Sequence, residues 1–265
     1  MSPDSADRAD RAGAGGDGAS HWRGGHIAVA IDGPAASGKS STAQWVAAEL
    51  GFRHVDSGAL YRAATAAALR SRVPVGEWTP GWVLAQAAHV TLVPNETSFT
   101  PQIDGASVIE EIRSPDVTRY VPRVAQMAEV REWVNGEVRE VARFHDVVCD
   151  GRDMGTAVFP DAELKVFLVA DPWERARRRL TQRLARRPSD EEIAEETDRL
   201  VQRDAADATQ TVQAKDAVLI DTTYLTQAEQ VERITALARA ARFRRPLTPW
   251  DGMPTIPPPG PDADH

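Results

Sequence analysis

The segment Gly-Pro-Ala-Ala-Ser-Gly-Lys-Ser at residues 33–40 has the residue types and spacing of a loop that binds phosphate groups. Glycines let such a loop turn its backbone amides toward phosphate oxygens, and the helix that follows adds the positive end of its dipole. The lysine then reaches the β- and γ-phosphates, and the adjoining hydroxyl binds Mg²⁺. The sequence therefore predicts a nucleoside triphosphate site whose ligands are Gly33, Pro34, Ala35, Ala36, Ser37, Gly38, Lys39, Ser40 and Ser41.

An accidental glycine-rich turn is the alternative, and the segments on either side argue against it. An apolar run at 26–32, typical of a buried strand, precedes the motif, and a helical pattern at 37–50 follows it. The lysines narrow the class of nucleotide-binding protein. None of Lys39, Lys165 and Lys215 lies in the Asn-Lys-x-Asp motif with which GTPases usually read guanine, which weakens that interpretation.

Two aspartates lie at the ends of short apolar runs farther along the chain. Asp56 ends the run at 52–56, and Asp150 lies near the end of the run at 147–151. An acid at the tip of a buried strand beside a phosphate-binding loop commonly helps to hold Mg²⁺. We therefore expect Ser40 and Asp150 to be the metal ligands. The alternative for Asp150 is a turn-forming role before Gly151.

The charge balance limits the partners of the chain. The 265 residues hold 31 Lys and Arg against 39 Asp and Glu, a formal net charge of −8, so we expect neither nucleic acid nor an anionic membrane as a partner. An anionic ligand then needs a local basic cluster, and the arginine-rich helical pattern at 174–187 supplies one. We expect Arg178 and Arg179 to face the triphosphate; a solvated helix face is the alternative.

Other features of the composition exclude whole classes of protein. The one cysteine, Cys149, rules out an intrachain disulfide and a cysteine-rich zinc site. No apolar run approaches the roughly 18–20 residues of a membrane helix, and the N-terminus has no apolar signal core. We expect a cytoplasmic protein.

The elements that must position these residues alternate between strand and helix patterns, which predicts an α/β fold. Its core is a P-loop NTPase-type parallel sheet with helices on both faces and ligands at the carboxyl ends of the strands. Further strands are predicted at 164–170 and 216–221, and further helices at 59–69, 190–205 and 227–242. Period-2 segments around an Asp104-Gly105 turn predict a small antiparallel insert at 89–113, followed by a polar helical stretch at 115–143.

Both ends of the chain have compositions that predict disordered tails. Residues 1–25 contain no Ile, Leu, Val or Phe, and residues 246–265 are rich in proline. The folded unit is expected at 26–243.

Beyond the phosphate-binding loop, several segments in order resemble the bacterial cytidylate kinase family. They are Ile31-Asp-Gly-Pro34, Asp56-Ser-Gly-Ala-Leu-Tyr-Arg62, Asp150-Gly-Arg-Asp-Met-Gly-Thr156 and Phe159-Pro-Asp-Ala162. The resemblance covers about residues 26–240, and this combination is far more specific than the loop alone. It implies transfer of the ATP γ-phosphoryl group, with Mg²⁺, to CMP or dCMP, giving CDP or dCDP. We expect a monomer.

The resemblance also implies roles for single residues. Arg62 and Arg152 match arginines that grip the acceptor phosphate. Arg131 and Asp153 match residues that read cytosine, and Arg203 and Asp207 match residues at the sugar. The full set expected to bind the acceptor is Ser57, Tyr61, Arg62, Arg131, Arg152, Asp153, Arg203 and Asp207, and the set expected to be catalytic is Lys39, Asp150, Arg152, Arg178 and Arg179.

The same resemblance divides the folded unit into three parts. A core would comprise residues 26–74 and 146–243, a nucleoside-monophosphate insert about 75–145, and a lid about 178–205.

Two positions depart from the family pattern. Pro122 stands where the family usually has a serine that contacts the base, and Gln210 stands where it usually has an arginine. Two alternatives to a cytidylate kinase therefore stay open. One is a P-loop kinase of relaxed or altered base choice, acting on UMP or another small acceptor; the other is a nucleotide-binding protein that has lost phosphoryl transfer.

Overall fold

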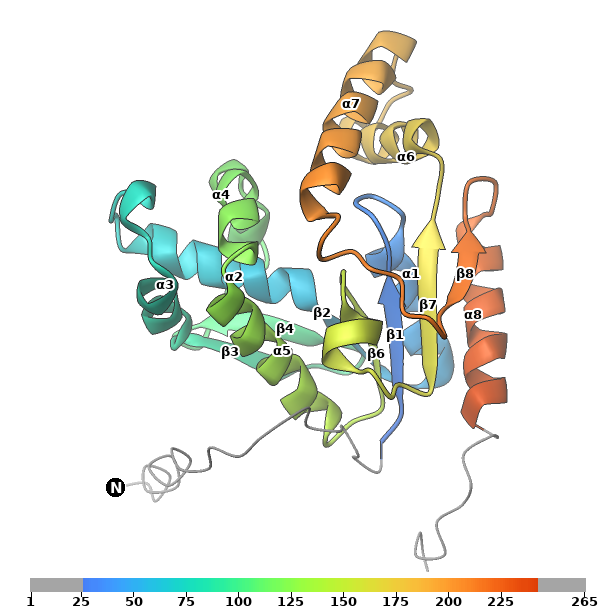
Figure 1. Cartoon of the computed structure of the whole chain (residues 1–265), viewed down its shortest axis with the longest axis horizontal. Helices are drawn as coiled ribbons and strands as arrows, with labels where there is room; N and C mark the ends of the chain where they lie inside the picture. Colours follow the sequence, from blue (N-terminus) through green and yellow to red (C-terminus); the bar gives the residue numbers. More distant parts are fainter. Residues whose placement is uncertain (1–25, 243–265) are drawn as a thin grey trace, which may run out of the picture.

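A five-stranded parallel sheet forms the centre of the computed structural model, which describes residues 26–242 (Figure 1). The strand order is β2-β6-β1-β7-β8, and the bounds are Ala28–Asp32 (β1), Arg53–Asp56 (β2), Val147–Asp150 (β6), Leu164–Val169 (β7) and Val218–Asp221 (β8). Each predicted strand of the core is confirmed, and so is the α/β fold. The predicted tails lie outside the described residues.

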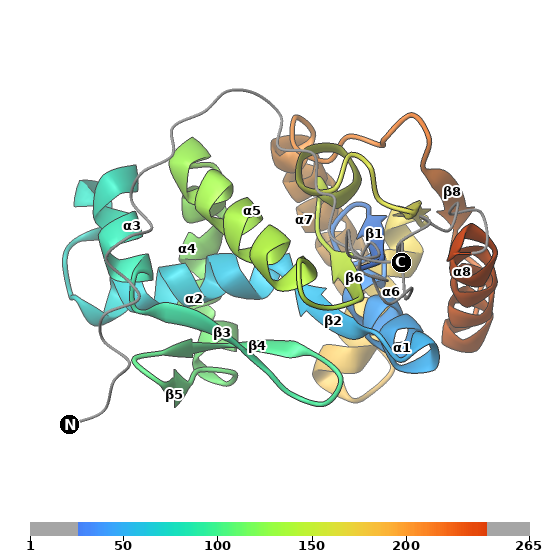
Figure 2. The same ribbon diagram turned by 90° about the horizontal axis from the view of Figure 1, so that it is seen from below.

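Helices cover both faces of this sheet, as predicted. Those on the faces are Lys39–Leu50 (α1), Ser57–Arg70 (α2) and Gln227–Arg242 (α8). Two further helices, Pro172–Leu184 (α6) and Asp190–Asp207 (α7), follow β7. Strand β1 shows how the two faces are divided, because Val29 and Ile31 join the cluster under α1 and α8 while Ala28 and Ala30 join the cluster under α2. Figure 2 shows α1 and α8 on the opposite side of the sheet from α2. No helix within residues 26–242 is long and apolar enough to cross a bilayer.

The predicted antiparallel insert is present between α2 and β6. Its strands Val90–Pro94 (β3), Phe99–Ile103 (β4) and Ala106–Ser107 (β5) pair in sequence order. The Asp104-Gly105 turn joins the last two, and both of its residues have positive φ. A further helix, Pro80–Ala87 (α3), was not expected from the sequence.

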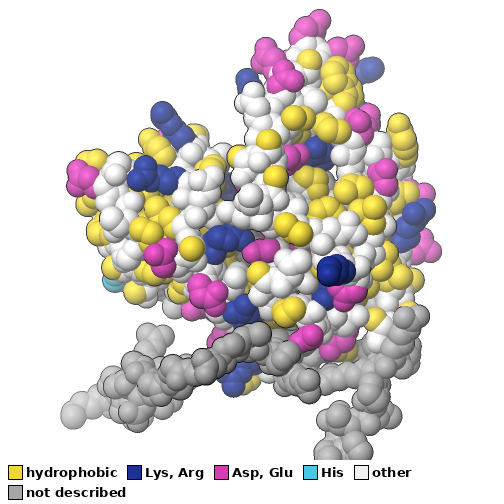
Figure 3. Space-filling model, viewed as in Figure 1, with side chains coloured by type: hydrophobic (Ala, Val, Ile, Leu, Met, Phe, Trp, Pro, Cys, Tyr) yellow, Lys and Arg dark blue, Asp and Glu magenta, His cyan; other side chains and the backbone are white. Residues whose placement is uncertain are grey.

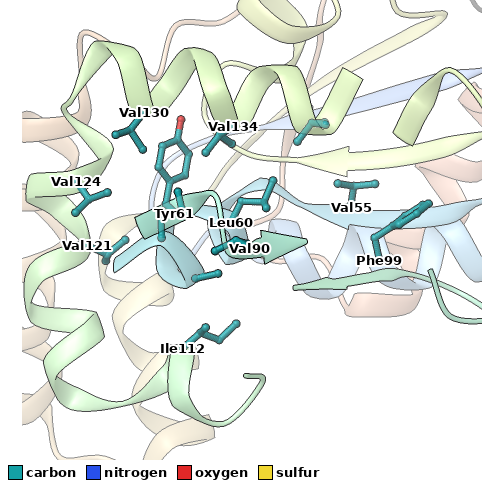
Figure 4. Close-up of a cluster of buried hydrophobic side chains, with 14 of the residues drawn as sticks. Val55, Leu60, Tyr61, Val90, Phe99, Ile112, Val121, Val124, Val130 and Val134 are labelled. Carbon is teal, nitrogen blue, oxygen red and sulfur yellow. The ribbon is translucent and has the colours of Figure 1, made fainter. Parts of the chain in front are cut away.

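The predicted helical stretch at about 115–143 is confirmed, and it consists of two helices. They are Pro115–Ala125 (α4) and Ala128–Ala142 (α5), and the backbone is extended at Met127 between them. The break lets the valines of both helices pack on the same helix, α2. Figure 4 shows Val121, Val124, Val130 and Val134 gathered around Tyr61.

The pair of helices α6 and α7 projects beyond the carboxyl end of the sheet (Figure 1). A small apolar cluster of its own holds the pair together, formed by Ala176, Leu180, Ile193 and Leu200. Ala35 of the phosphate-binding loop belongs to the same cluster. Packing therefore joins this helical pair directly to the loop.

Candidate functional site

The phosphate-binding loop turns between the end of β1 and the start of α1, in the context that the sequence predicted. Gly33 and Gly38 both have positive φ. A Cβ atom at Gly33 would lie 2.2 Å from the carbonyl oxygen of Leu168, so only glycine fits at the start of the loop. Gly38 then precedes Lys39, the first residue of α1, and the loop lies at the positive end of that helix.

Lys39 is buried inside the loop. Its Nζ donates a hydrogen bond of 2.6 Å to the Pro34 carbonyl oxygen. Burial, and next the nearby charge of Arg152, lower the pKa of Lys39 to about 7, while Asp150 and Asp32 act in the opposite direction. A phosphate group near Nζ would favour the charged form of the lysine. Lys39 is thus placed to respond strongly to an anion in the loop.

Ser40 and Asp150 meet at the tip of β6. The Ser40 Oγ donates to Asp150 Oδ2 at 2.5 Å, and Asp150 Oδ1 lies 2.7 Å from His54 Nε2. Asp56 is the register partner of Asp150 on the neighbouring strand. Burial, and next the charge of Asp150, raise the pKa of Asp56 to about 6. Two strand-end carboxylates beside a hydroxyl make this a place that favours a cation.

Magnesium fits this donor set. No cluster of three or more His, Cys, Asp or Glu side chains suited to a metal occurs within residues 26–242. Mg²⁺ does not need one, because it commonly takes one or two protein oxygens and completes its shell with phosphates and water. The Ser40 hydroxyl and the Asp150 carboxylate supply such oxygens beside the phosphate-binding loop.

One cavity of about 290 Å³ adjoins Lys39, Ser40 and Asp150 at the carboxyl end of the sheet. Every residue that was expected to bind the acceptor lines it, although these residues come from α2, α5, the loop after β6 and α7. They are Ser57, Tyr61, Arg62, Arg131, Arg152, Asp153, Arg203 and Asp207. Basic and acidic side chains are interspersed over the face of the molecule in Figure 3. The cavity, in contrast, gathers four arginines in one place.

Three of these arginines are held by few acceptors. Arg152 Nε lies 3.3 Å and Arg203 Nε 3.8 Å from the same oxygen of Asp207. Arg62 donates to the Ile112 carbonyl and to the Thr118 hydroxyl, both at 3.1 Å. Burial, followed by the charge of Arg152, lowers the pKa of Arg203. Three half-buried guanidiniums, two of which share the Asp207 carboxylate, are suited to an anion.

Arg131 is fixed from several sides at the far wall of the cavity. It donates to Asp153 Oδ2 and, at 2.9 Å, to Gln210 Oε1, and its guanidinium lies 5.9 Å from the centre of the Tyr61 ring. The Tyr61 hydroxyl is buried and, among the described residues, has no hydrogen-bond partner. Pro122 and Gln210 both line the cavity. The two departures from the family pattern therefore fall at the site.

Comparison with known proteins supplies the family. The family model "Cytidylate kinase" matches residues 29–240. The chain belongs to the cytidylate kinase family. It is 40% identical over 229 residues to a cytidylate kinase from Enterococcus faecalis (83% of this chain, 98% of that protein) and 39% identical over 219 residues to one from Exiguobacterium sibiricum (81% and 98%).

A second kind of relative is longer than this chain. A bifunctional pantoate ligase/cytidylate kinase from Synechococcus sp. is 42% identical over 224 residues, which are 82% of this chain but 41% of that protein. The chain therefore spans less than half of these longer relatives and nearly all of the shorter cytidylate kinases.

The two arginines of α6 expected at the triphosphate lie in different places. Arg179 lines a second hollow of about 740 Å³, which runs from the phosphate-binding loop past Arg62 to the insert. Arg178 is not among the lining residues of either hollow, and its Nη2 donates to the carbonyl oxygens of Thr222 and Thr223 after β8, both at 2.6 Å. Geometry thus brings Arg179 to the loop, whereas Arg178 joins α6 to the edge of the sheet.

Asp32 belongs to the Ile31–Pro34 segment of the resemblance, but the sequence predicted no role for its side chain. Its two carboxylate oxygens accept backbone N–H bonds of 2.8 Å each from Met154 and Gly155. Burial raises the pKa of Asp32 to about 6, although these two bonds oppose the shift. The carboxylate ties the end of β1 to the loop that carries Arg152 and Asp153. Nothing in the sequence joins two segments so far apart.

Ala35 has a second set of partners that the sequence did not reveal. Its N–H donates to Asp204 Oδ1 at 3.0 Å, and its carbonyl oxygen accepts from Arg175 Nη1 at 2.7 Å. Arg175 and Asp204 also pair with each other at 2.6 Å, which joins α6 to α7. Both backbone polar groups of one loop residue are therefore bound by the helical pair.

Proposed function

We propose that this chain transfers the γ-phosphoryl group of ATP to CMP or dCMP, giving CDP or dCDP. The observation that carries the proposal is the single cavity that gathers arginines and aspartates from four separate elements beside the phosphate-binding loop. Membership of the cytidylate kinase family and the names of its relatives support it.

On the donor side, the loop amides and Lys39 would bind the triphosphate. Phosphoryl transfer depends mainly on positioning and on neutralising charge, and a buried lysine and a helix N-terminus supply both. Ser40 and Asp150 would hold Mg²⁺, which would neutralise part of the negative charge of the phosphates. Arg179 would reach the same phosphates from α6. Arg178 stays a weaker candidate for this role, because its guanidinium is bound to the chain after β8.

On the acceptor side, Arg62 and Arg152 would hold the phosphate of the nucleoside monophosphate in line with the donor, and Arg203, with Asp207, would lie at the sugar. That phosphate is ionised at neutral pH, so its oxygen can attack phosphorus without a base to remove a proton. Planar guanidiniums suit the task, because each can bind a phosphate through two parallel N–H bonds.

The rest of the acceptor would lie along the far wall of the cavity. Arg131 and Asp153 would bind the polar edge of cytosine, with Tyr61 beside them, while Asp207 and Ser57 would lie nearer the sugar and phosphate. Gln210 accepts a hydrogen bond from Arg131 and would so help to orient its guanidinium toward the base.

We also propose the expected division into parts. The core would be 26–74 and 146–243, the insert about 75–145 and the lid about 178–205, with the lid formed by much of α6 and α7. A cytoplasmic monomer acting on small nucleotides, with no nucleic acid or membrane partner, completes the proposal.

A panel of acceptors tests the activity. ATP and Mg²⁺ are incubated with CMP, dCMP, UMP and AMP in turn, and the nucleoside diphosphates are measured. We expect the highest kcat/KM with CMP or dCMP. A clear preference for UMP would favour the alternative of altered base choice, for which the positions of Pro122 and Gln210 in the cavity are the specific observation. No transfer to any acceptor would favour a nucleotide-binding protein.

A further inference from the structure

A single buried carboxylate collects three arginines in the α6–α7 pair. Glu196 lies on α7 with its side chain 4% exposed. Its oxygens lie 3.1 Å from Arg179 Nε, 3.7 Å from Arg183 Nη1 and 3.4 Å from Arg199 Nη1. Arg199 also lies 3.3 Å from Glu195. Two carboxylates thus face three arginines, and one positive charge is available to an anion.

Arg179 differs from the other two arginines in where it lies. Arg179 lines the hollow that begins at the phosphate-binding loop, and Lys39 and Ser40 of the loop line the same hollow. Arg183 and Arg199 are not among the residues that line either hollow. Glu196 therefore has one partner that can reach a bound phosphate and two that lie elsewhere on the helical pair.

The surroundings of Arg179 would push it away from the loop. The same hollow contains Arg62, and the charge of Arg179 is one of several like charges that, after burial, lower the pKa of Arg62 and of Arg203. In the described part of the chain, the ion-pair partner of Arg179 is Glu196. Without that carboxylate, the guanidinium would turn toward solvent, since 35% of the side chain is already exposed.

We propose that Glu196 is a positioning residue for ATP, which holds the Arg179 guanidinium at the phosphate-binding loop against the repulsion of the other arginines. The proposal rests on the proposed function in taking ATP as the ligand of the loop and Arg179 as one of its phosphate contacts. Glu196 touches neither nucleotide; it acts through Arg179. Its loss should weaken ATP binding and leave acceptor binding unchanged.

The test compares ATP and acceptor binding in Glu196→Gln, which keeps the size of the side chain and removes its charge. Titration with the non-hydrolysable analogue AMP-PNP and Mg²⁺, with no acceptor present, should give a Kd about tenfold higher than that of wild type, the scale of one charge-assisted hydrogen bond. In turnover assays the KM for ATP should rise by a similar factor, while the KM for CMP should change less than twofold. Binding of AMP-PNP is measured without an acceptor, so it still reports on Glu196 if CMP proves to be the wrong acceptor.

Variants of the partners distinguish positioning of Arg179 from support of the helices. Arg179→Ala should raise the Kd for AMP-PNP at least as much as Glu196→Gln, and the double variant should bind no more weakly than Arg179→Ala alone. Arg183→Ala and Arg199→Ala, which remove the other two partners, should leave the Kd within twofold. Glu192→Gln, which breaks an exposed ion pair between α7 and Arg186 of the preceding loop, is the matched control and should also have no effect.

Three results would overturn the proposal. They are an unchanged Kd in Glu196→Gln, an equal loss in Arg183→Ala or Arg199→Ala, and additive losses in the double variant. If Glu196→Gln does not melt cooperatively, Glu196→Asp replaces it, because it keeps the charge but draws it back by one methylene. Glu196→Asp should also weaken AMP-PNP binding, and an unchanged Kd in that variant would again contradict the proposal.

Discussion

Gln210 accepts a hydrogen bond of 2.9 Å from Arg131, so a position that departs from the family pattern is joined to the residue expected to read the base. An arginine at 210 could not accept this bond. The glutamine therefore changes the site in a definite way, by adding an acceptor that fixes the guanidinium.

The first prediction concerns this bond. Gln210→Ala leaves Arg131 with Asp153 and the Ala125 carbonyl, and it should raise the KM for CMP by about fivefold with little change in kcat, since one hydrogen bond contributes about 1 kcal/mol. Steady-state kinetics with CMP and UMP measures the effect. Gln213→Ala, a change to an exposed glutamine nearby, is the control. Equal KM values in wild type and Gln210→Ala would show that Arg131 does not need this partner.

Lys39→Ala should nearly abolish transfer. The side chain is the buried cation of the phosphate-binding loop, and loss of such a group costs on the order of 10³ in rate, about 4 kcal/mol of transition-state stabilisation. CDP formation from ATP and CMP is the measurement, with the exposed Lys215→Ala as control. Activity within tenfold of wild type would contradict the assignment of the loop.

Arg62 and Arg152 should matter far more than Arg70. The first two line the acceptor cavity, whereas Arg70 pairs with Glu111 on the surface. We expect Arg62→Ala and Arg152→Ala each to lower kcat/KM for CMP by roughly 10²- to 10³-fold, since each removes a charged phosphate ligand, and Arg70→Ala to lower it less than threefold. Similar losses in all three variants would show that the phosphate ligands have been misassigned.

Removal of the metal tests the pair formed by Ser40 and Asp150. Excess EDTA should stop transfer, and added Mg²⁺ should restore it. Asp150→Asn should raise the Mg²⁺ concentration for half-maximal rate by about tenfold, because a neutral amide is a poorer ligand for a hard cation. Asp116→Asn, at an exposed position on α4, serves as the control. An unchanged Mg²⁺ requirement in Asp150→Asn would remove that residue from the metal site.

Asp32→Asn should lower the free energy of unfolding by about 2 kcal/mol. Both carboxylate oxygens of Asp32 accept a backbone N–H, and an asparagine amide accepts only one while its NH₂ group faces the other donor. Urea unfolding followed by circular dichroism gives the value. Asp221→Asn provides a comparison, because that carboxylate also accepts a backbone N–H but is exposed to water. A change as small as that in Asp221→Asn would show that water or movement of the loop satisfies the second donor.

The sheet and the place of the phosphate-binding loop could be predicted from the sequence because their signals are local. Apolar runs mark the strands, and the segments around Asp56 and Asp150 follow strand ends, which a parallel sheet brings to one edge. Helix α3 was missed because its eight residues begin with Pro80 and Gly81, which resemble a turn. The break at Met127 was missed because it depends on packing against α2, which no local pattern encodes.

Long-range partners account for the rest of what the sequence could not reveal. Asp32, Ala35 and Arg178 each form hydrogen bonds with residues far away along the chain. One partner in each bond is a backbone group, which every residue type carries, so the sequence cannot indicate it. Glu196 resembles the many acidic residues of α7 that face solvent, and only burial distinguishes it. Arg178 and Arg179 are adjacent in sequence, but consecutive side chains of a helix point in different directions, so the two arginines have different surroundings.

The backbone N–H of Ala35 makes the phosphate-binding loop sensitive to motion of α7. Its amide proton is held by Asp204, so the proton can exchange with solvent only when the helical pair moves away from the loop or the loop itself opens. Coupling of this kind is reciprocal: a nucleotide that holds the loop more firmly must disfavour the open position of α7 by the same free energy. The exchange rate of the Ala35 amide proton, followed by NMR as nucleotide is added, would therefore report how often the loop and α7 separate.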